Sequence, residues 1–157
     1  MNREGFGFGK VILFGEHAVV HGQAAVAGAL RRGVRASAGQ GPALLRVEPW
    51  GLVARPDGTG PADRAFAAIL AVTGCGAATV TATAELPPSA GLGGAAALAA
   101  AVARALCRDE VRVGEAVDAA ERVFHGTPSG IDAAMALRGG FGRFTREDGL
   151  RPLVAAP

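Results

Sequence analysis

Apolar and polar residues alternate along the first third of the chain, as they do in β-strands that bury one face. The alternation predicts two strands within residues 6–20, with an interruption at residues 15–17. Gly and Pro at residues 39–42 predict a turn, and a hairpin should follow it. The other strands predicted in this part are residues 24–29 and 33–38, with hairpin strands at 44–48 and 51–54.

Helical spacing of apolar residues replaces the alternation after residue 62. Phe66, Ile69 and Leu70 fall on one face of a helix over residues 63–72, and Gly74 is a stop signal for it. Similar patterns predict helices over residues 94–107, 113–124 and 131–137, and strands over residues 78–85 and 139–144.

This order of elements predicts an α+β fold, because strands come first, two consecutive helices follow and a strand comes last. We expect a mixed sheet with helices packed on one face. No linker divides the chain, so residues 1–157 should form one domain. Many of the apolar residues are Ala, which favours close helix packing over a core of aromatic side chains.

Composition excludes several classes of function. Half of the residues are hydrophobic and 19% are charged, which is typical of a folded domain. A net charge of +2 indicates neither a nucleic acid nor a membrane as partner. The chain start does not look like a signal peptide and no apolar run is long enough to span a bilayer, so we expect a cytoplasmic protein. Cys75 and Cys107 lack the spacing of a zinc site.

A Gly-rich loop at residues 87–94 carries the strongest chemical signal. It leads from a predicted strand into the N-terminus of an Ala-rich helix, where backbone N–H groups are unpaired and the helix dipole is positive. Gly91, Gly93 and Gly94 would let a phosphate approach the backbone closely. The same residues are also consistent with an ordinary turn before a helix.

Three further segments contain candidate charged groups. Asp132 follows the loop at residues 125–130, where it would serve as a general base or merely cap a short helix. Lys10, the only lysine among 16 basic residues, lies on an apolar strand, although a lone lysine on a strand is usually at the surface. Glu121 and His125 are four residues apart and share a helical face. Glu121 would be a magnesium ligand, or the two would form an ordinary exposed pair.

Three segments taken together resemble a known family. GKVILFGEHAVVHG at residues 9–22 is similar to the first motif of mevalonate kinases. PPSAGLGGAAA at residues 87–97 resembles the ATP-binding motif of the GHMP kinase superfamily. HGTPSGID at residues 125–132 resembles the mevalonate kinase segment that carries the catalytic Asp. The chain therefore resembles the GHMP kinases, most closely the mevalonate kinases, over residues 5–144.

The resemblance implies the fold of ribosomal protein S5 domain 2 and the N-terminal, ATP-binding domain of a kinase over residues 1–157. It implies transfer of the ATP γ-phosphate to the primary hydroxyl of mevalonate, with ATP and Mg²⁺ as cofactors. The residues implied are Asp132 and Lys10 for catalysis, Glu121 for the metal, Glu16, His17, Thr127 and Ser129 for the substrate, and Pro88, Ala90, Gly91, Leu92, Gly93, Gly94 and Ala95 for the nucleotide.

Two departures from the family pattern keep other functions open. Ala95 stands where the family has a serine whose hydroxyl binds magnesium and phosphate, and the chain lacks the C-terminal domain of the family. A different alcohol substrate, or a truncated nucleotide-binding module without activity of its own, would also fit. A homodimer, or a partner that supplies the missing domain, would complete the site.

Overall fold

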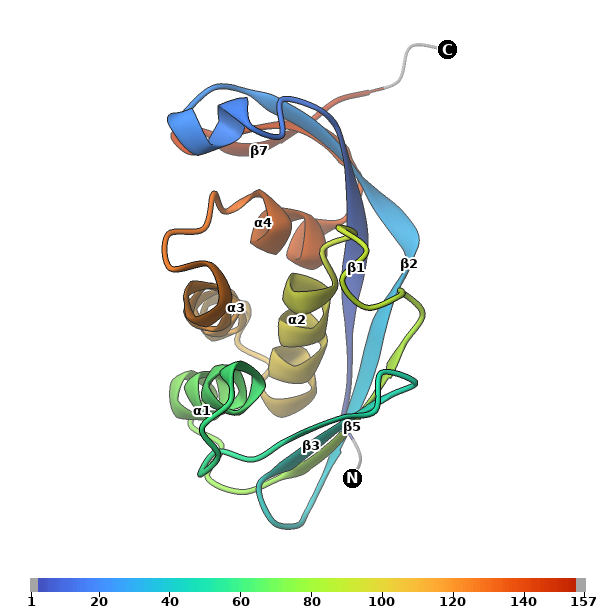
Figure 1. Cartoon of the computed structure of the whole chain (residues 1–157), viewed down its shortest axis with the longest axis vertical. Helices are drawn as coiled ribbons and strands as arrows, with labels where there is room; N and C mark the ends of the chain where they lie inside the picture. Colours follow the sequence, from blue (N-terminus) through green and yellow to red (C-terminus); the bar gives the residue numbers. More distant parts are fainter. Residues whose placement is uncertain (1–2, 155–157) are drawn as a thin grey trace.

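A computed structural model describes residues 3–154, which form a mixed sheet covered on one face by helices (Figure 1). This arrangement confirms the predicted α+β fold. Within these residues the strands are β1 (Arg3–Phe14), β2 (Ala25–Gly39), β3 (Leu44–Glu48), β4 (Leu52–Ala54), β5 (Thr79–Ala84), β6 (Phe141–Thr145) and β7 (Gly149–Pro152), and the α-helices are α1 (Pro61–Thr73), α2 (Gly94–Leu106), α3 (Glu110–His125) and α4 (Ile131–Arg138).

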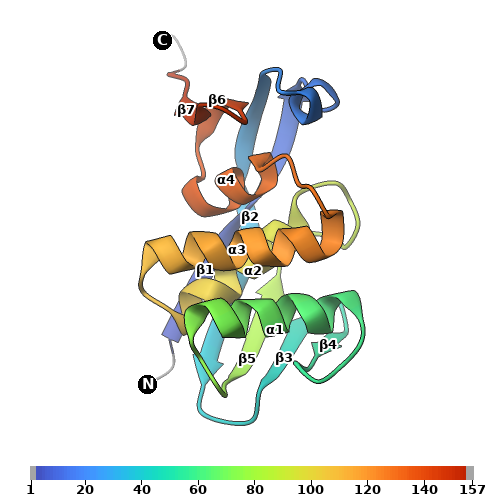
Figure 2. The same cartoon turned by 90° about the vertical axis from the view of Figure 1, so that its left-hand side faces the viewer.

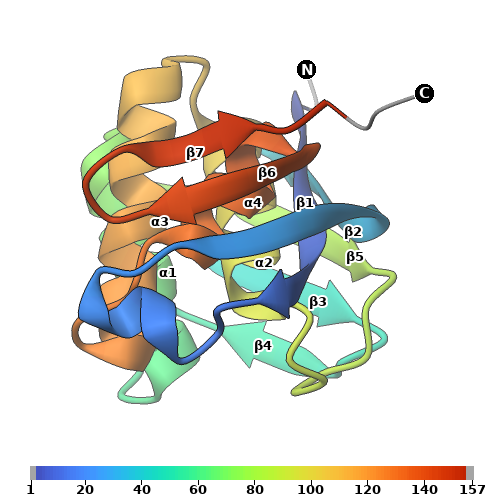
Figure 3. The same cartoon turned by 90° about the horizontal axis from the view of Figure 1, so that it is seen from above.

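Strand β2 organises the sheet, whose order is β4-β3-β5-β2-β6-β7 with β1 also paired to β2. The second half of β2 pairs with β5, and its first residues pair with β6. Figure 3 shows β6 beside this first part of β2, with β7 on the far side of β6. Only β3 and β5 run parallel among these pairs, and the other neighbours are antiparallel. The two halves of β2 therefore join the two ends of the molecule.

Helix α2 forms the inner helical layer against β1 and β2. Most of its residues are small and fully buried, as the Ala-rich sequence predicted. The backbones approach so closely that a Cβ on Gly7 of β1 would overlap the carbonyl of Ala97. Small residues on both elements thus allow the short distance between α2 and β1, and this packing fixes where the N-terminus of α2 lies.

Helices α1 and α3 lie over α2, and Figure 2 shows α3 between α4 and α1. The start of α1 is fixed by Asp63, whose carboxylate accepts hydrogen bonds from the N–H groups of Arg55 (2.8 Å) and Gly60 (2.9 Å). These bonds, first that from Arg55, hold the pKa of Asp63 below its usual value. They anchor the β4–α1 connection. Within residues 3–154, no helix has the length and apolar character needed to cross a membrane.

Two predictions differ from the structure, and one strand was missed. Only one strand lies within residues 6–20, because Gly15 takes a left-handed φ of 83° and a 3₁₀ turn, Ala18–His21, follows. The strands predicted at 24–29 and 33–38 are one strand, β2, with an irregularity opposite Gly9 where the pairing shifts. Strand β7 was not predicted.

Candidate functional site

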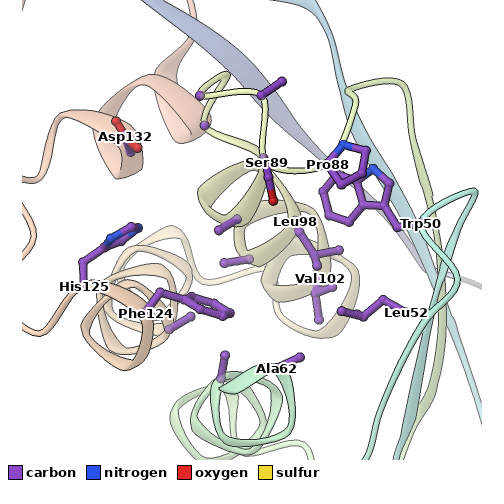
Figure 4. A pocket seen from close by; sticks show the side chains of 18 of the residues that line it. Trp50, Leu52, Ala62, Pro88, Ser89, Leu98, Val102, Phe124, His125 and Asp132 are labelled. Atoms are coloured by element: carbon purple, nitrogen blue, oxygen red, sulfur yellow. The ribbon is translucent and has the colours of Figure 1, made fainter. Parts of the chain in front are cut away.

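A cavity of about 650 Å³ lies between helices α1, α2 and α3 and the β3–β4 hairpin. The loop at residues 87–93 forms its roof. Figure 4 shows Asp132 and His125 on one side of it and Trp50 and Leu52 on the other. The cavity has the size of small-molecule sites in proteins. Lys10 and His125 lie on the same side of the cavity as Asp132, and most of the wall is apolar.

An ion pair between a buried lysine and a partly exposed aspartate lies at the polar end of the cavity. The Nζ of Lys10 lies 3.2 Å from Oδ1 of Asp132, and Lys10 is only 6% exposed. Strand β1 supplies the lysine and the first turn of α4 supplies the aspartate. A lysine is rarely buried without a partner because its charge must be compensated. Lys10 is therefore not the surface residue that a lone strand lysine usually is.

The Gly-rich loop is built around this lysine. The N–H of Lys10 donates to the carbonyl of Leu92 at 2.9 Å, which ties the loop to β1. Gly93 has a φ of 69°, and a Cβ there would lie 2.8 Å from Cγ of Lys10. Backbone conformation and space therefore both require glycine at this position.

The N-terminus of α2 opens into the cavity. Its N-cap, Gly93, has no side chain that could bond the first turn, and Gly94 and Ala95 line the cavity wall. The free N–H groups and the positive end of the helix dipole suit an anion. Of the seven residues predicted to bind the nucleotide, only Leu92 is absent from the wall, because its side chain packs against the core.

The apolar wall contains residues that sequence reasoning did not identify. Trp50 follows β3, and its indole N–H donates to the carbonyl of Leu86 at 2.7 Å. Leu52, Val102 and Phe124 face the same space from three other elements (Figure 4). The only sign of this wall in the sequence is the single tryptophan, Trp50, at the tip of a predicted hairpin. The other three are apolar residues whose periodicity cannot distinguish a cavity wall from a packed core.

Glu121 lies buried on α3 near the ion pair, with its side chain 3% exposed. Its Oε2 is 3.9 Å from Nε2 of His125, and its Oε1 has no hydrogen-bond partner among the described residues. Burial, with the charges of Asp132 and Asp118, raises the pKa of Glu121 to about 7. An exposed helix pair is therefore the wrong interpretation of Glu121.

The surroundings of Glu121 fit a cation only in part. An unpaired, buried carboxylate oxygen is a suitable ligand for a hard cation such as Mg²⁺. Residues 3–154 contain no group of three or more His, Cys, Asp or Glu side chains that could hold a metal ion. A magnesium ion here would take its remaining ligands from phosphates and water, as is usual for this ion.

The four residues predicted for the substrate are not all in the cavity wall. Glu16 lines the cavity, whereas His17, Thr127 and Ser129 do not. His17 and Thr127 are exposed, beside the entrance to the 3₁₀ turn and on the loop before α4. The Oγ of Ser129 accepts a long hydrogen bond, 3.4 Å, from the N–H of Ile131. Ser129 thus supports the start of α4, the helix that carries Asp132.

Comparison with known proteins gives a consistent result. The model of the GHMP kinases N terminal domain matches residues 61–140. A mevalonate kinase of Aeropyrum pernix is 31% identical over 153 residues, which cover 84% of this chain and 47% of that protein.

Solved structures share the fold of the whole described chain. A Methanococcus jannaschii mevalonate kinase has a TM-score of 0.79 at 19% identity, with 99% of this chain and 56% of that chain covered. An L. major mevalonate kinase in complex with R-mevalonate has a TM-score of 0.65 at 26% identity, with coverage of 96% and 52%. A Lactococcus lactis galactokinase complexed with galactose has a TM-score of 0.68 at 15% identity, with coverage of 98% and 47%.

The chain spans about half the length of these relatives. The family model covers just over half of the chain, including the Gly-rich loop, helices α1 to α4 and Asp132. The order of the motifs, the fold and the family match agree. This chain belongs to the GHMP kinases, and the part of the family that it matches is the N-terminal domain.

Proposed function

We propose that this chain carries the nucleotide site and the catalytic pair of a kinase that phosphorylates the primary hydroxyl of mevalonate. The observation that carries the proposal is the Lys10–Asp132 pair, which lies at the cavity end beside the N-terminus of α2. A carboxylate, a fixed cation and a helix N-terminus in one cavity are the groups that phosphoryl transfer requires.

The chemistry needs positioning and compensation of charge more than covalent help from the protein. Asp132 accepts the proton of the substrate hydroxyl, or orients that hydroxyl. The hydroxyl oxygen of the substrate then bonds to the γ-phosphorus of ATP. The bond between that phosphorus and the β–γ bridging oxygen breaks in the same reaction. Lys10 holds Asp132 in place and stabilises negative charge on the transferring group.

The cavity offers two different environments to ATP. The N–H groups at the start of α2 would bind its phosphates, next to Gly93, Gly94 and Ala95. The apolar wall around Trp50 and Phe124 would accept a flat base. Glu121 would hold Mg²⁺ through its unpaired Oε1. When bound, this ion neutralises phosphate charge and fixes the phosphate geometry.

A second GHMP kinase activity, with another alcohol as acceptor, has one observation in its favour. The galactokinase structure has the same fold as this chain over 98% of this chain. Ala95 supports a third candidate, a nucleotide-binding module without activity of its own, because no hydroxyl is available at this position of α2. Similar relatives are about twice as long, so a second domain or a partner would close the site.

One assay separates these candidates. ADP release by the purified chain is measured with Mg²⁺ and, in turn, mevalonate, phosphomevalonate, homoserine and galactose, for the wild-type chain and for Ala95→Ser. We expect turnover with mevalonate alone, and a gain of up to roughly 10²–10³ in Ala95→Ser from a restored transition-state contact. Turnover with another alcohol would contradict the proposed substrate, and no turnover in either protein would favour the inactive module.

A further inference from the structure

Arg104, in the last turn of α2, bonds to three other elements with one side chain. Its Nη1 donates to the carbonyl of Phe6 in β1 at 3.0 Å, and its Nη2 donates to the carbonyl of Leu137 in α4 at 2.9 Å. The same Nη2 donates to Oε2 of Glu110, the first residue of α3, at 3.0 Å. Figure 1 shows α2 between β1 and α3, where a single guanidinium can reach all of these elements.

The two carbonyl bonds join the elements that carry the ion pair of the cavity. Strand β1 carries Lys10, and α4 carries Asp132. Apart from this ion pair, Arg104 is the only residue within 3–154 whose side chain hydrogen-bonds to both elements. Ile12 of β1 also packs against the apolar cluster that contains Ile131 of α4, but apolar contacts are not directional. A planar guanidinium does fix the geometry of the groups that it bonds.

Both carbonyls need a donor from outside their own element. The carbonyl of Leu137 belongs to the last turn of α4, where carbonyls lack helical partners and a cation is favourable for the helix dipole. Strand β1 pairs only with β2 among the described strands, so its other edge depends on side chains. The Arg104 side chain is 23% exposed and that of Glu110 is 65% exposed, so the ion pair between them contributes little compared with the carbonyl bonds.

We propose that Arg104 is a positioning residue, which holds α4 against β1 so that Asp132 stays beside Lys10. Phe6 lies about 13 Å from Lys10 along β1, and Leu137 about 8 Å from Asp132 along α4. Arg104 is also absent from the cavity wall, so it acts through the backbone and not on the substrate. Its effect on turnover rests on the proposed function, whereas its effect on the ion pair concerns the free chain.

Lys10 is the only lysine of the chain, so acetylation of its side-chain amine reports on the ion pair without any substrate. An amine-reactive reagent is used under native conditions, and peptide mapping separates Lys10 from the α-amino group. Arg104→Met removes both carbonyl bonds and keeps an unbranched stem for packing. We expect Lys10 to react about tenfold faster in Arg104→Met, as loss of hydrogen bonds from a charged donor implies.

Steady-state kinetics distinguish positioning from nucleotide binding. We expect kcat to fall by about 10–10²-fold in Arg104→Met, with the KM for ATP within about twofold of the wild type, because the catalytic pair is misplaced while the nucleotide wall is intact. Arg104→Lys should fall as far, since an ammonium group keeps the charge but cannot span the two carbonyls. Full rescue by Arg104→Lys would overturn the role of the guanidinium bridge.

Two controls separate this role from stability. Glu110→Gln removes the ion pair with Arg104 and keeps both carbonyl bonds, so it should match the wild type in labelling and kcat. Val80→Ala makes a cavity in the buried core at β5, outside the site, and should lower stability without faster labelling of Lys10.

The outcomes for Arg104 and for the proposed function are distinguishable. Wild-type labelling of Lys10 in Arg104→Met, or an equal rise in Val80→Ala, would overturn the role of Arg104 and leave the proposed function standing. A wild-type chain without turnover on any of the four alcohols would overturn the proposed function. Faster labelling confined to Arg104→Met would still support Arg104 as the residue that holds the pair.

Discussion

The Lys10–Asp132 pair shows how single residues set the chemistry of the cavity. A buried lysine costs free energy through desolvation, and the cost is offset by the carboxylate 3.2 Å away. Gly93 leaves the room that the lysine stem occupies, and the carbonyl of Leu92 fixes the backbone at Lys10. A phosphate that enters beside this pair would meet a cation that is already in position.

Glu121 should make stability depend on pH. Its pKa is about 7 in the folded chain and 4.5 as a free side chain, so the folded state retains a proton that the unfolded state releases. The contribution of Glu121 to stability is then largest below pH 4.5 and is lost as the pH rises through 7, by roughly 3 kcal/mol at most. Urea unfolding from about pH 5 to about pH 8 measures this loss.

Glu121→Gln is the control for this effect, because it keeps the shape of the side chain without its ionisation. The stability difference between wild type and variant should shrink, or change sign in favour of the variant, across the same pH range. Parallel pH profiles for the two proteins would show that Glu121 ionises in the folded chain at its ordinary pKa.

At the scale of elements, the site depends on how closely α2 lies against β1. Gly7→Ala should push these two elements apart, because the new Cβ would overlap the carbonyl of Ala97. We expect a loss of roughly 1–3 kcal/mol, the usual cost of overpacking, and weaker ATP binding because the helix N-terminus moves. Chemical denaturation and calorimetry measure the two effects.

Gly114→Ala is the matched control for that prediction. Gly114 lies inside α3, and a Cβ added there would meet no atom within 4 Å, so alanine should stabilise the helix by about 0.5–1 kcal/mol. Opposite signs for the two glycine substitutions are expected. A neutral Gly7→Ala would mean that β1 and α2 have room to spare.

Most elements were predictable because they follow local rules. The periodicity around Phe66 and the Gly74 stop located α1, and the alternation of Thr and Val located β5. The failures have non-local causes. The pairing irregularity in β2 looks like a break between two strands, and β7 is a four-residue edge strand whose pairing with β6 outweighs its weak pattern.

The candidate site divides in the same way. Lys10, Asp132 and the Gly-rich loop were identified because motif order and wording carry them. The apolar wall was not, because tertiary packing decides whether Phe124 faces a cavity.

The whole molecule brings together groups from opposite ends of the chain. Strand β1 delivers Lys10, and α4, more than 100 residues later, delivers Asp132 to the same end of the cavity. Strand β2 links these elements, because it pairs with β1 and also with β6, the strand that follows α4. The relatives contain about as much chain again, so the activity of this half on its own is the central question.

The most direct measurement is mevalonate-dependent release of ADP by the wild-type chain and by Asp132→Asn, with Asp57→Asn as control on an exposed loop. The account predicts turnover in the wild type and the control, and a loss of at least about 10²-fold in Asp132→Asn, since removal of a catalytic acid–base group typically costs about 10²–10⁴. Equal turnover in Asp132→Asn would contradict the assignment of Asp132 and the Lys10 pair as the catalytic centre.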